Sequence, residues 1–184
     1  MAIRGSIRIL GFVGILIVSV CAALGWFLHP AAAQSTQIQT DYLMTLYAPL
    51  APPQVVSDLR IFNIREGGYV EGPRFKGKII QPAGDWNRRM PDGTTRMDVR
   101  LTIQTDDNAF IYVEYSGVAK LSKEAGDRLG KGQALGSNDG YFMITARFQT
   151  TSAKYAWLNE LIAAGRMVSL KGGDHIKYEL FSLR

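Results

Sequence analysis

Two neighbouring stretches, Arg96–Gln104 (RMDVRLTIQ) and Phe110–Tyr115 (FIYVEY), decide the fold of this chain. In both, apolar and polar residues alternate with a period of two, which is the pattern of a β-strand with one apolar face. The segment between them, Asp106-Asp107-Asn108, favours a turn, because short polar side chains bond to the local backbone and tolerate left-handed conformations. The two stretches therefore predict a hairpin. If those three residues form the loop, the facing pairs are Gln104 with Phe110, Thr102 with Tyr112, and Arg100 with Glu114.

This register gives the hairpin an aliphatic face and a polar face, whereas a two-residue loop would exchange the faces of one strand. The aliphatic face holds Val99, Leu101, Ile103, Ile111, Val113 and Tyr115; the polar face holds Asp98, Arg100, Thr102, Tyr112 and Glu114. One interpretation buries the aliphatic face and leaves Arg100 and Glu114 as an exposed cross-strand pair. The other is a small barrel whose polar face lines a cavity. Charges buried in that way need mutual pairing or a ligand, so the second interpretation predicts a site.

Eight short motifs follow one another along the chain. They are Gly72-Pro73-Arg74, Gly84-Asp85-Trp86, Asp92-Gly93, Asp98-Val99-Arg100, Thr105-Asp106-Asp107, Ile111-Tyr112-Val113, Tyr115-Ser116-Gly117 and Tyr155-Ala156-Trp157-Leu158-Asn159. In this order they resemble the domain of unknown function 3237 family, over nearly all of the chain after about Thr40. The resemblance implies a single antiparallel β-barrel similar to the calycins, with Asp85, Trp86, Asp98, Arg100 and the tyrosines as the pocket set. The chain departs from the family pattern where Met143, Ala146 and Gln149 replace an expected Arg, Pro and Glu.

The N-terminus has the pattern of an export signal. Arg4 and Arg8 precede an apolar run from Ile9 to Leu28, and small residues follow up to Ala33. This pattern predicts a Sec-type signal peptide, residues 1–33, cut after Ala33, with an uncleaved membrane anchor as the alternative. Either way the protein is expected to be exported, to the periplasm or the medium. The signal holds 2 of the 21 basic residues and none of the 16 acidic ones, so the mature chain carries 19 − 16 = +3.

The mature chain is expected to form a flexible leader, residues 34–40, followed by a single mainly β domain, residues 41–184. The Gly-, Asn-, Asp- and Pro-rich segment from Pro82 to Thr95 predicts a long loop. Thr150-Thr151-Ser152 predicts the cap of one short helix from about Ala153 to Ala164, with Gly165 as its stop. Further strands are expected at 42–50, 59–64, 75–81, 141–148, 167–170 and 175–183.

Several standard chemistries lack sequence support. After removal of the signal, His175 is the only histidine and no cysteine remains, so neither a zinc site nor another metal site is predicted. A Ser-His-Asp triad would have to use His175, which has no nucleophile motif nearby and is expected to be an ordinary strand residue. No phosphate-binding glycine loop and no basic-aromatic cluster occur, so no cofactor and no nucleic-acid partner are predicted.

The remaining chemistry is a metal-free acid/base site. A carboxylate in a dry pocket has a raised pKa, which lets it exchange protons near neutral pH. The candidate catalytic residues are Asp85, Asp98 and Glu114. The candidate ligand-binding residues are Arg74, Trp86, Arg100, Tyr112, Tyr115 and Trp157.

Two function classes fit this set. The first is an exported barrel that binds a small hydrophobic or aromatic molecule, with contact to the membrane only through the uncleaved signal. The second is a cofactor-free lyase, isomerase or cyclase that uses its carboxylates as general acid and base.

Overall fold

The computed structural model describes residues 37–184; the predicted signal peptide and residues 34–36 of the predicted leader lie outside the described residues. Residues 38–184 form one compact unit. Its strands are β1 (Thr40–Pro49), β2 (Gln54–Val56), β3 (Leu59–Asn63), β4 (Tyr69–Glu71), β5 (Lys76–Arg89), β6 (Thr95–Thr105), β7 (Phe110–Leu121), β8 (Leu135–Gly136), β9 (Gly140–Gln149), β10 (Ala163–Lys171) and β11 (His175–Leu183). Two short helices accompany them, α1 (Lys123–Gly130) and the 3₁₀ helix η1 (Ala153–Glu160).

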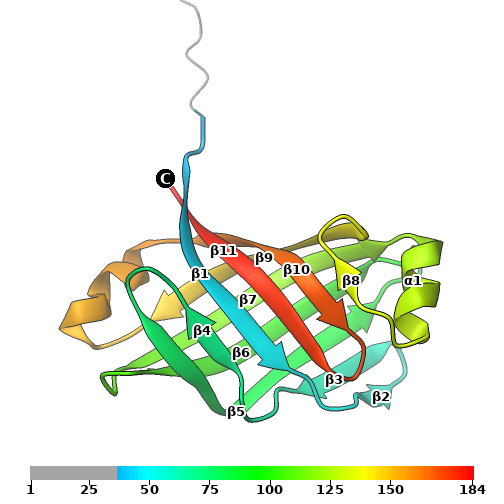
Figure 1. Ribbon diagram of the computed structural model, residues 1–184, viewed down its shortest axis with the longest axis horizontal. Helices are drawn as coiled ribbons and strands as arrows, with labels where there is room; N and C mark the ends of the chain where they lie inside the picture. The colour runs from blue at the N-terminus through cyan, green and yellow to red at the C-terminus, as the bar shows by residue number, and fades with distance from the viewer. Residues whose placement is uncertain (1–36) are drawn as a thin grey trace, which may run out of the picture. The chain divides into compact units, whose positions relative to one another are not determined.

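Eight of these strands close into an antiparallel β-barrel (Figure 1). Their order around the barrel is β5–β4–β1–β11–β10–β9–β7–β6, and β6 pairs back onto β5. β2 and β3 extend the sheet beside the second half of β5, and β8 pairs with β10. Closure leaves few unpaired strand edges, which would otherwise template aggregation. The prediction of a single antiparallel β-barrel in a mainly β chain is confirmed.

The β6–β7 hairpin has the register that the sequence predicts. Arg100 faces Glu114, and the loop residue Asn108 has a φ of 65°, the left-handed conformation that short polar side chains tolerate. The barrel is filled by the aliphatic face, whose residues Val99, Leu101, Ile103, Ile111, Val113 and Tyr115 are all buried. The interpretation in which the polar face lines the cavity is therefore wrong. Packing decides the matter, because burying six apolar side chains contributes about 1.5–3 kcal/mol each, whereas burying the opposite face would desolvate charges.

The prediction of a long loop from Pro82 to Thr95 is also wrong. β5 continues to Arg89, and only residues 90–94 make the turn into β6. The register of β5 against β6 shifts between Ile80 and Gly84, so Pro82 lies in a bulge where it breaks no ladder hydrogen bond. The turn-forming residues at the start of this segment belong to the bulge, and those at its end belong to the short turn. The residues between them are part of strand β5.

The two helices differ from the prediction of one helix over 153–164. η1 ends at Glu160 and Ala163 already belongs to β10; Ser152 makes no side-chain cap bond. The second helix, α1, lies in the glycine-rich segment after β7 and is capped by Ser122, whose Oγ accepts a hydrogen bond from the Ala125 N–H. No helix in residues 37–184 has the length and apolar character of a membrane span.

The helices mark opposite ends of the barrel (Figure 1). β7 begins at Phe110, whose carbonyl accepts a hydrogen bond from Thr150 Oγ1 just before η1. It ends at Leu121, next to the cap of α1. We refer to these two ends as the η1 end and the α1 end.

Candidate functional site

The barrel interior contains a cavity of about 160 Å³ toward the α1 end, which we call the inner pocket. Its walls come from the strands β3, β5, β6, β7, β9, β10 and β11, from α1 and from the β10–β11 turn. The lining residues that matter below are Arg60, Phe62, Asp85, Asn87, Arg89, Ala119, Leu129 and Phe142. A cavity of this size is on the order of one aromatic ring, since an apolar cavity of about 150 Å³ binds benzene.

Strand alternation places the polar residues of this pocket. After the bulge, Asp85, Asn87 and Arg89 occupy every second position of β5 and all line the inner pocket. On the neighbouring strand β3, Phe62 is paired with Asp85 and Arg60 with Asn87. A carboxyl, an amide and two guanidinium groups therefore lie on the inner side of one strand pair.

Asp85 is the most unusual of these groups. Its side chain is only 5% exposed, and burial raises its pKa from 3.8 to about 7. Asn87 opposes the shift by donating a hydrogen bond from Nδ2 to Asp85 Oδ2 at 2.9 Å, while the charge of Asp98 raises the pKa further. The other oxygen, Oδ1, has no hydrogen-bond partner, and neither does the buried Oδ1 of Asn87. A buried acceptor left unpaired is costly, so this pair is poised to receive donors.

Aromatic side chains adjoin Asp85 in the barrel interior. Burial raises the pKa of both Tyr115 and Tyr178 well above the usual 10, and the charge of Asp85 adds to the rise at both, after that of Tyr115 in the case of Tyr178. The ring of Tyr178 makes an edge contact with Tyr115 at 5.8 Å between centroids and a tilted contact with Phe142 at 5.9 Å. Because Phe142 lines the inner pocket, these contacts join the surroundings of Asp85 to the pocket wall.

Arg60 and Arg89 are exposed residues that line the same pocket. Among the ion pairs within residues 37–184, none includes either guanidinium. The positive charges at the exposed part of the pocket are thus not neutralised by carboxylates of the described chain.

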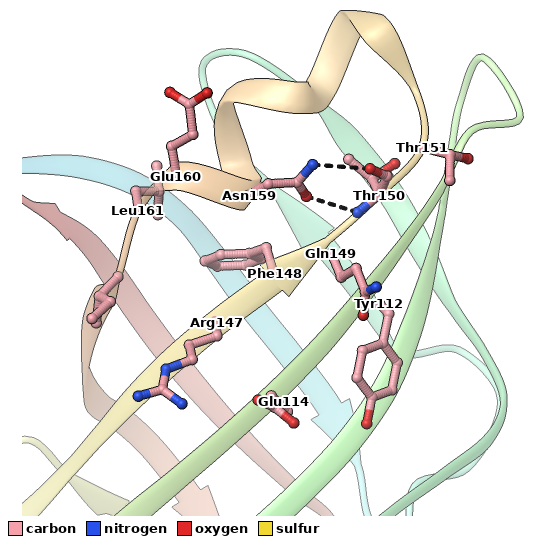
Figure 2. Close-up of a pocket in the computed structure, with 11 residues that line it drawn as sticks. Tyr112, Glu114, Arg147, Phe148, Gln149, Thr150, Thr151, Asn159, Glu160 and Leu161 are labelled. Atoms are coloured by element: carbon pink, nitrogen blue, oxygen red, sulfur yellow. Dashed lines mark hydrogen bonds between the residues drawn. The ribbon is translucent and has the colours of Figure 1, made fainter.

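A second and larger depression, of about 620 Å³, lies on the outside of the barrel (Figure 2). We call it the outer groove. Figure 2 shows Tyr112, Glu114 and Arg147 on its floor, projecting from β7 and β9, with Asn159 and Glu160 of η1 beside it. The side-chain amide of Asn159 makes two hydrogen bonds with the backbone of Thr150. It accepts one from the Thr150 N–H at 2.8 Å and donates one to the Thr150 carbonyl at 3.0 Å.

The predicted site residues fall into three places. Asp85 and Tyr115 lie together in the barrel interior. Trp86, Asp98, Arg100, Tyr112 and Glu114 project from the outer face of the same strands. There Asp98 and Arg100 form an ion pair at 3.2 Å with more than half of each side chain exposed (55% and 51%). Their predicted position in an enclosed pocket with Asp85 is therefore wrong; only Tyr112 and Glu114 of this set line the outer groove.

Arg74 and Trp157 lie at the η1 end, where the Arg74 guanidinium stacks 3.5 Å from the centre of the Trp157 ring. Phe75 contacts the rings of both Tyr155 and Trp157, so these aromatic residues pack together. The predicted ligand-binding pair thus contacts other side chains of the protein, at the end opposite to the inner pocket.

His175 makes contacts that resemble a catalytic triad. Its Nε2 lies 2.9 Å from Ser169 Oγ, and its Nδ1 lies 3.3 Å from Asp174 Oδ2. Neither the inner pocket nor the outer groove includes Ser169 or His175, however. We assign no chemistry to this contact. Across residues 37–184 no group of three or more histidine, cysteine or acidic side chains is arranged to hold a metal ion.

Sequence reasoning missed Arg60, Asn87, Arg89 and Tyr178. The signal for two of them was present, because Asp85, Asn87 and Arg89 alternate with period two opposite the alternating residues of β6. The bulge at Pro82 and the turn-forming composition hid that alternation.

The comparisons with known proteins agree with this architecture. Residues 38–183 match the model of the family described as protein of unknown function (DUF3237). A solved structure of a β-barrel-like protein from Acinetobacter baumannii is 30% identical, with a TM-score of 0.66, covering 83% of this chain and 99% of that one. A UPF0311 protein from Clostridium acetobutylicum is 33% identical over 91 residues, which is 50% of this chain and 58% of that protein.

One relative is named after a reaction. The hydroalkoxylation enzyme phnH from Penicillium herquei is 30% identical over 122 residues, 66% of the length of each protein.

Proposed function

Because the chain belongs to the DUF3237 family and shares its barrel with the Acinetobacter structure, we propose that it binds a small, largely apolar or aromatic molecule in the inner pocket. The observation that carries this proposal is Asp85, a buried carboxyl group on the wall of a cavity, with one oxygen that has no hydrogen-bond partner. Native proteins pair nearly all buried polar atoms, so an unpaired one on a residue that lines a cavity is typical of a ligand site.

The walls of the pocket favour an apolar ring. Phe62, Leu129 and Phe142 contribute apolar surface, and the buried carboxyl and amide groups of Asp85 and Asn87 lie side by side on one strand. Binding sites for small molecules typically combine a mainly apolar wall with a small number of placed polar groups.

The outer groove is larger but supports binding less well. Glu114 and Arg147 there are exposed to solvent, and among residues 37–184 no side chain lining the groove has a buried polar atom without a hydrogen-bond partner. The side-chain amide of Asn159 already makes two hydrogen bonds with the backbone of Thr150. For these reasons we place the binding site inside the barrel.

A binding measurement with a pocket-filling variant tests the proposal. Phenol, titrated into the mature protein and followed by NMR, is expected to bind saturably. Ala119→Leu adds three carbon atoms to the pocket wall and is expected to abolish binding, because Ala119 is buried and lines the cavity. Ala164→Leu, on the outer side of β10, is the matched control and should bind as the unaltered protein does. Equal binding by all three proteins would exclude the inner pocket.

A second candidate is proton-transfer catalysis in the same pocket. Two observations favour it: the pKa of Asp85 is raised to about 7, and one relative is named as a hydroalkoxylation enzyme. In hydroalkoxylation an O–H adds across a C=C bond, so a proton leaves oxygen and a proton arrives at carbon, with no change of oxidation state. A carboxyl group with a pKa near 7 can take the first proton and deliver the second. In this case Asp85→Asn should lower turnover by roughly 10²–10⁴-fold while binding persists.

The export prediction also stands as a proposal. It rests on the Arg-flanked apolar run and on the small residues before Gln34. Intact-mass measurement of protein from an envelope fraction should give a chain that starts at Gln34. A full-length species held in the membrane would contradict cleavage.

A further inference from the structure

We infer that the ligand of the inner pocket is a hydroxylated aromatic carboxylic acid, held by its hydroxyl group at Asp85 and Asn87 and by its carboxylate at Arg60 and Arg89. This inference rests on the proposed function, because it names the ligand class for the same pocket. It is argued from four polar side chains of the pocket, Arg60 on β3 and Asp85, Asn87 and Arg89 on the paired strand β5.

The inner polar groups favour a hydrogen-bond donor on the ligand. Asp85 Oδ1 and Asn87 Oδ1 are both buried acceptors without a partner. A hydroxyl group can donate to such an acceptor, whereas an ether, a ketone or a bare hydrocarbon cannot. A second carboxylate at this position would meet a buried carboxyl and would raise the pKa of Asp85 further.

The arginines require the opposite chemistry. Arg60 and Arg89 line the pocket, carry permanent positive charge and form no ion pair among the described residues. Two guanidinium groups around one cavity repel a cationic ligand and offer parallel N–H donors to a carboxylate. The charge-bearing end of the ligand is therefore anionic and lies nearer to solvent than its hydroxyl group.

The spacing suits a single ring. Asn87 and Arg89 are two residues apart on β5, which separates their inward positions by roughly 7 Å. A para-substituted benzene ring bridges such a distance between its two substituents. The cavity of about 160 Å³ also matches one ring.

Three probes separate the contributions of the two substituents: 4-hydroxybenzoate, benzoate, which lacks the hydroxyl, and phenol, which lacks the carboxylate. Isothermal titration of the mature protein near pH 7 is expected to rank 4-hydroxybenzoate at least tenfold tighter than either fragment. Charge-assisted hydrogen bonds are among the strongest that proteins make, so losing one produces a change of about this size or larger.

Two variants should act selectively. The double variant Arg60→Met/Arg89→Met is expected to bind 4-hydroxybenzoate and benzoate at least tenfold more weakly. Its affinity for phenol should not change. Asp85→Leu removes the acceptor without leaving a buried charge. This variant is expected to bind 4-hydroxybenzoate and phenol more weakly but to bind benzoate as before. Arg96→Met is the control, because Arg96 is exposed and does not line the pocket.

The outcomes distinguish the inference from the proposed function. If all three probes bind equally and Ala119→Leu abolishes their binding, the pocket binds rings but the inferred ligand class is wrong. If the arginine variant leaves benzoate unchanged, the carboxylate assignment is overturned. If none of the probes binds, or if Ala119→Leu has no effect, the proposed function fails together with the inference.

Discussion

The two ends of the barrel are built from the same strands, yet they treat their polar groups in opposite ways. At the η1 end, Asp107 accepts hydrogen bonds from Thr105, Lys154 and Tyr155. The bond from Lys154 is the largest of several causes that hold the pKa of Asp107 far below its usual range. At the α1 end, Asp85 and Asn87 share one hydrogen bond and each keeps a buried oxygen unpaired.

This difference separates stability from function. The η1 end closes the barrel with aromatic packing and satisfied hydrogen bonds, both of which stabilise a fold. The α1 end keeps a cavity and a buried titratable group, which cost stability and persist in proteins mainly at functional sites. Substitutions at the two ends should therefore have opposite effects on the free energy of unfolding.

The largest effect is expected at the η1 end. Tyr155 is buried, contacts Phe75 and donates its hydroxyl to Asp107. Tyr155→Ala should lower the free energy of unfolding by about 3–5 kcal/mol, because it leaves a cavity and removes a hydrogen bond. Urea titration measures this loss. The exposed Tyr141→Ala serves as control, with an expected change below about 0.5 kcal/mol. Similar losses for the two variants would mean that η1 does not close the barrel.

At the α1 end, Asp85→Asn should increase stability in a pH-dependent manner. The folded-state pKa of Asp85 is about 7 and its ordinary value is 3.8, so between these pH values the folded chain binds more protons than the unfolded chain. Stability of the unaltered protein therefore falls as the pH rises through this window and levels off above about pH 7. Asn cannot ionise, so the variant lacks this loss.

The stability difference between Asp85→Asn and the unaltered protein should be near zero at pH 4. It should reach the order of 4 kcal/mol at pH 8, since each pKa unit corresponds to about 1.4 kcal/mol. Urea titrations at several pH values measure the difference, in which the effects of the other carboxylates cancel. A difference that does not change with pH would show that Asp85 ionises as an exposed carboxyl group does.

The fold was accessible from the sequence because it follows from local pattern. Alternation in β6 and β7 and the short polar side chains of their turn specify the hairpin, and Asn108 has the positive φ expected there. The site was less accessible, because which face lies inside depends on the closure of distant strands. Asp98 and Asp85 both carry a carboxyl group in a family motif, but one lies outside the barrel and the other inside. The register of β5 against β6 explains the difference, because Asp85 is paired with the buried Val99 and Asp98 with the exposed Trp86.

A smaller effect is expected for the contact between Arg74 and Trp157. Replacing Arg74 by Met keeps most of the stem and removes the charge that stacks on the ring. The loss of stability should be about 0.5–1 kcal/mol, the usual contribution of an exposed cation–π contact. Denaturant titration detects it, and Arg74→Lys should recover part of the loss. Weakened phenol binding in Arg74→Met would contradict a purely structural role for this residue.

The smallest effects are expected on the outer face. Asp98→Asn and Arg100→Met break an ion pair that is more than half exposed, so each should change stability by less than about 0.5 kcal/mol. Retention of phenol should also be unchanged in both variants. A large loss of phenol binding in either variant would mean that the ligand binds at the polar face of the β6–β7 hairpin.

One measurement bears directly on where the ligand binds. Backbone amide resonances of a protein that comprises residues 34–184, followed by NMR during titration with phenol, report which strands contact the probe. We expect the largest shifts at Arg60, Phe62, Asp85 and Asn87, around the inner pocket. If the shifts instead gather at Tyr112, Glu114 and Arg147, the ligand occupies the outer groove, and the assignment of the inner pocket is contradicted.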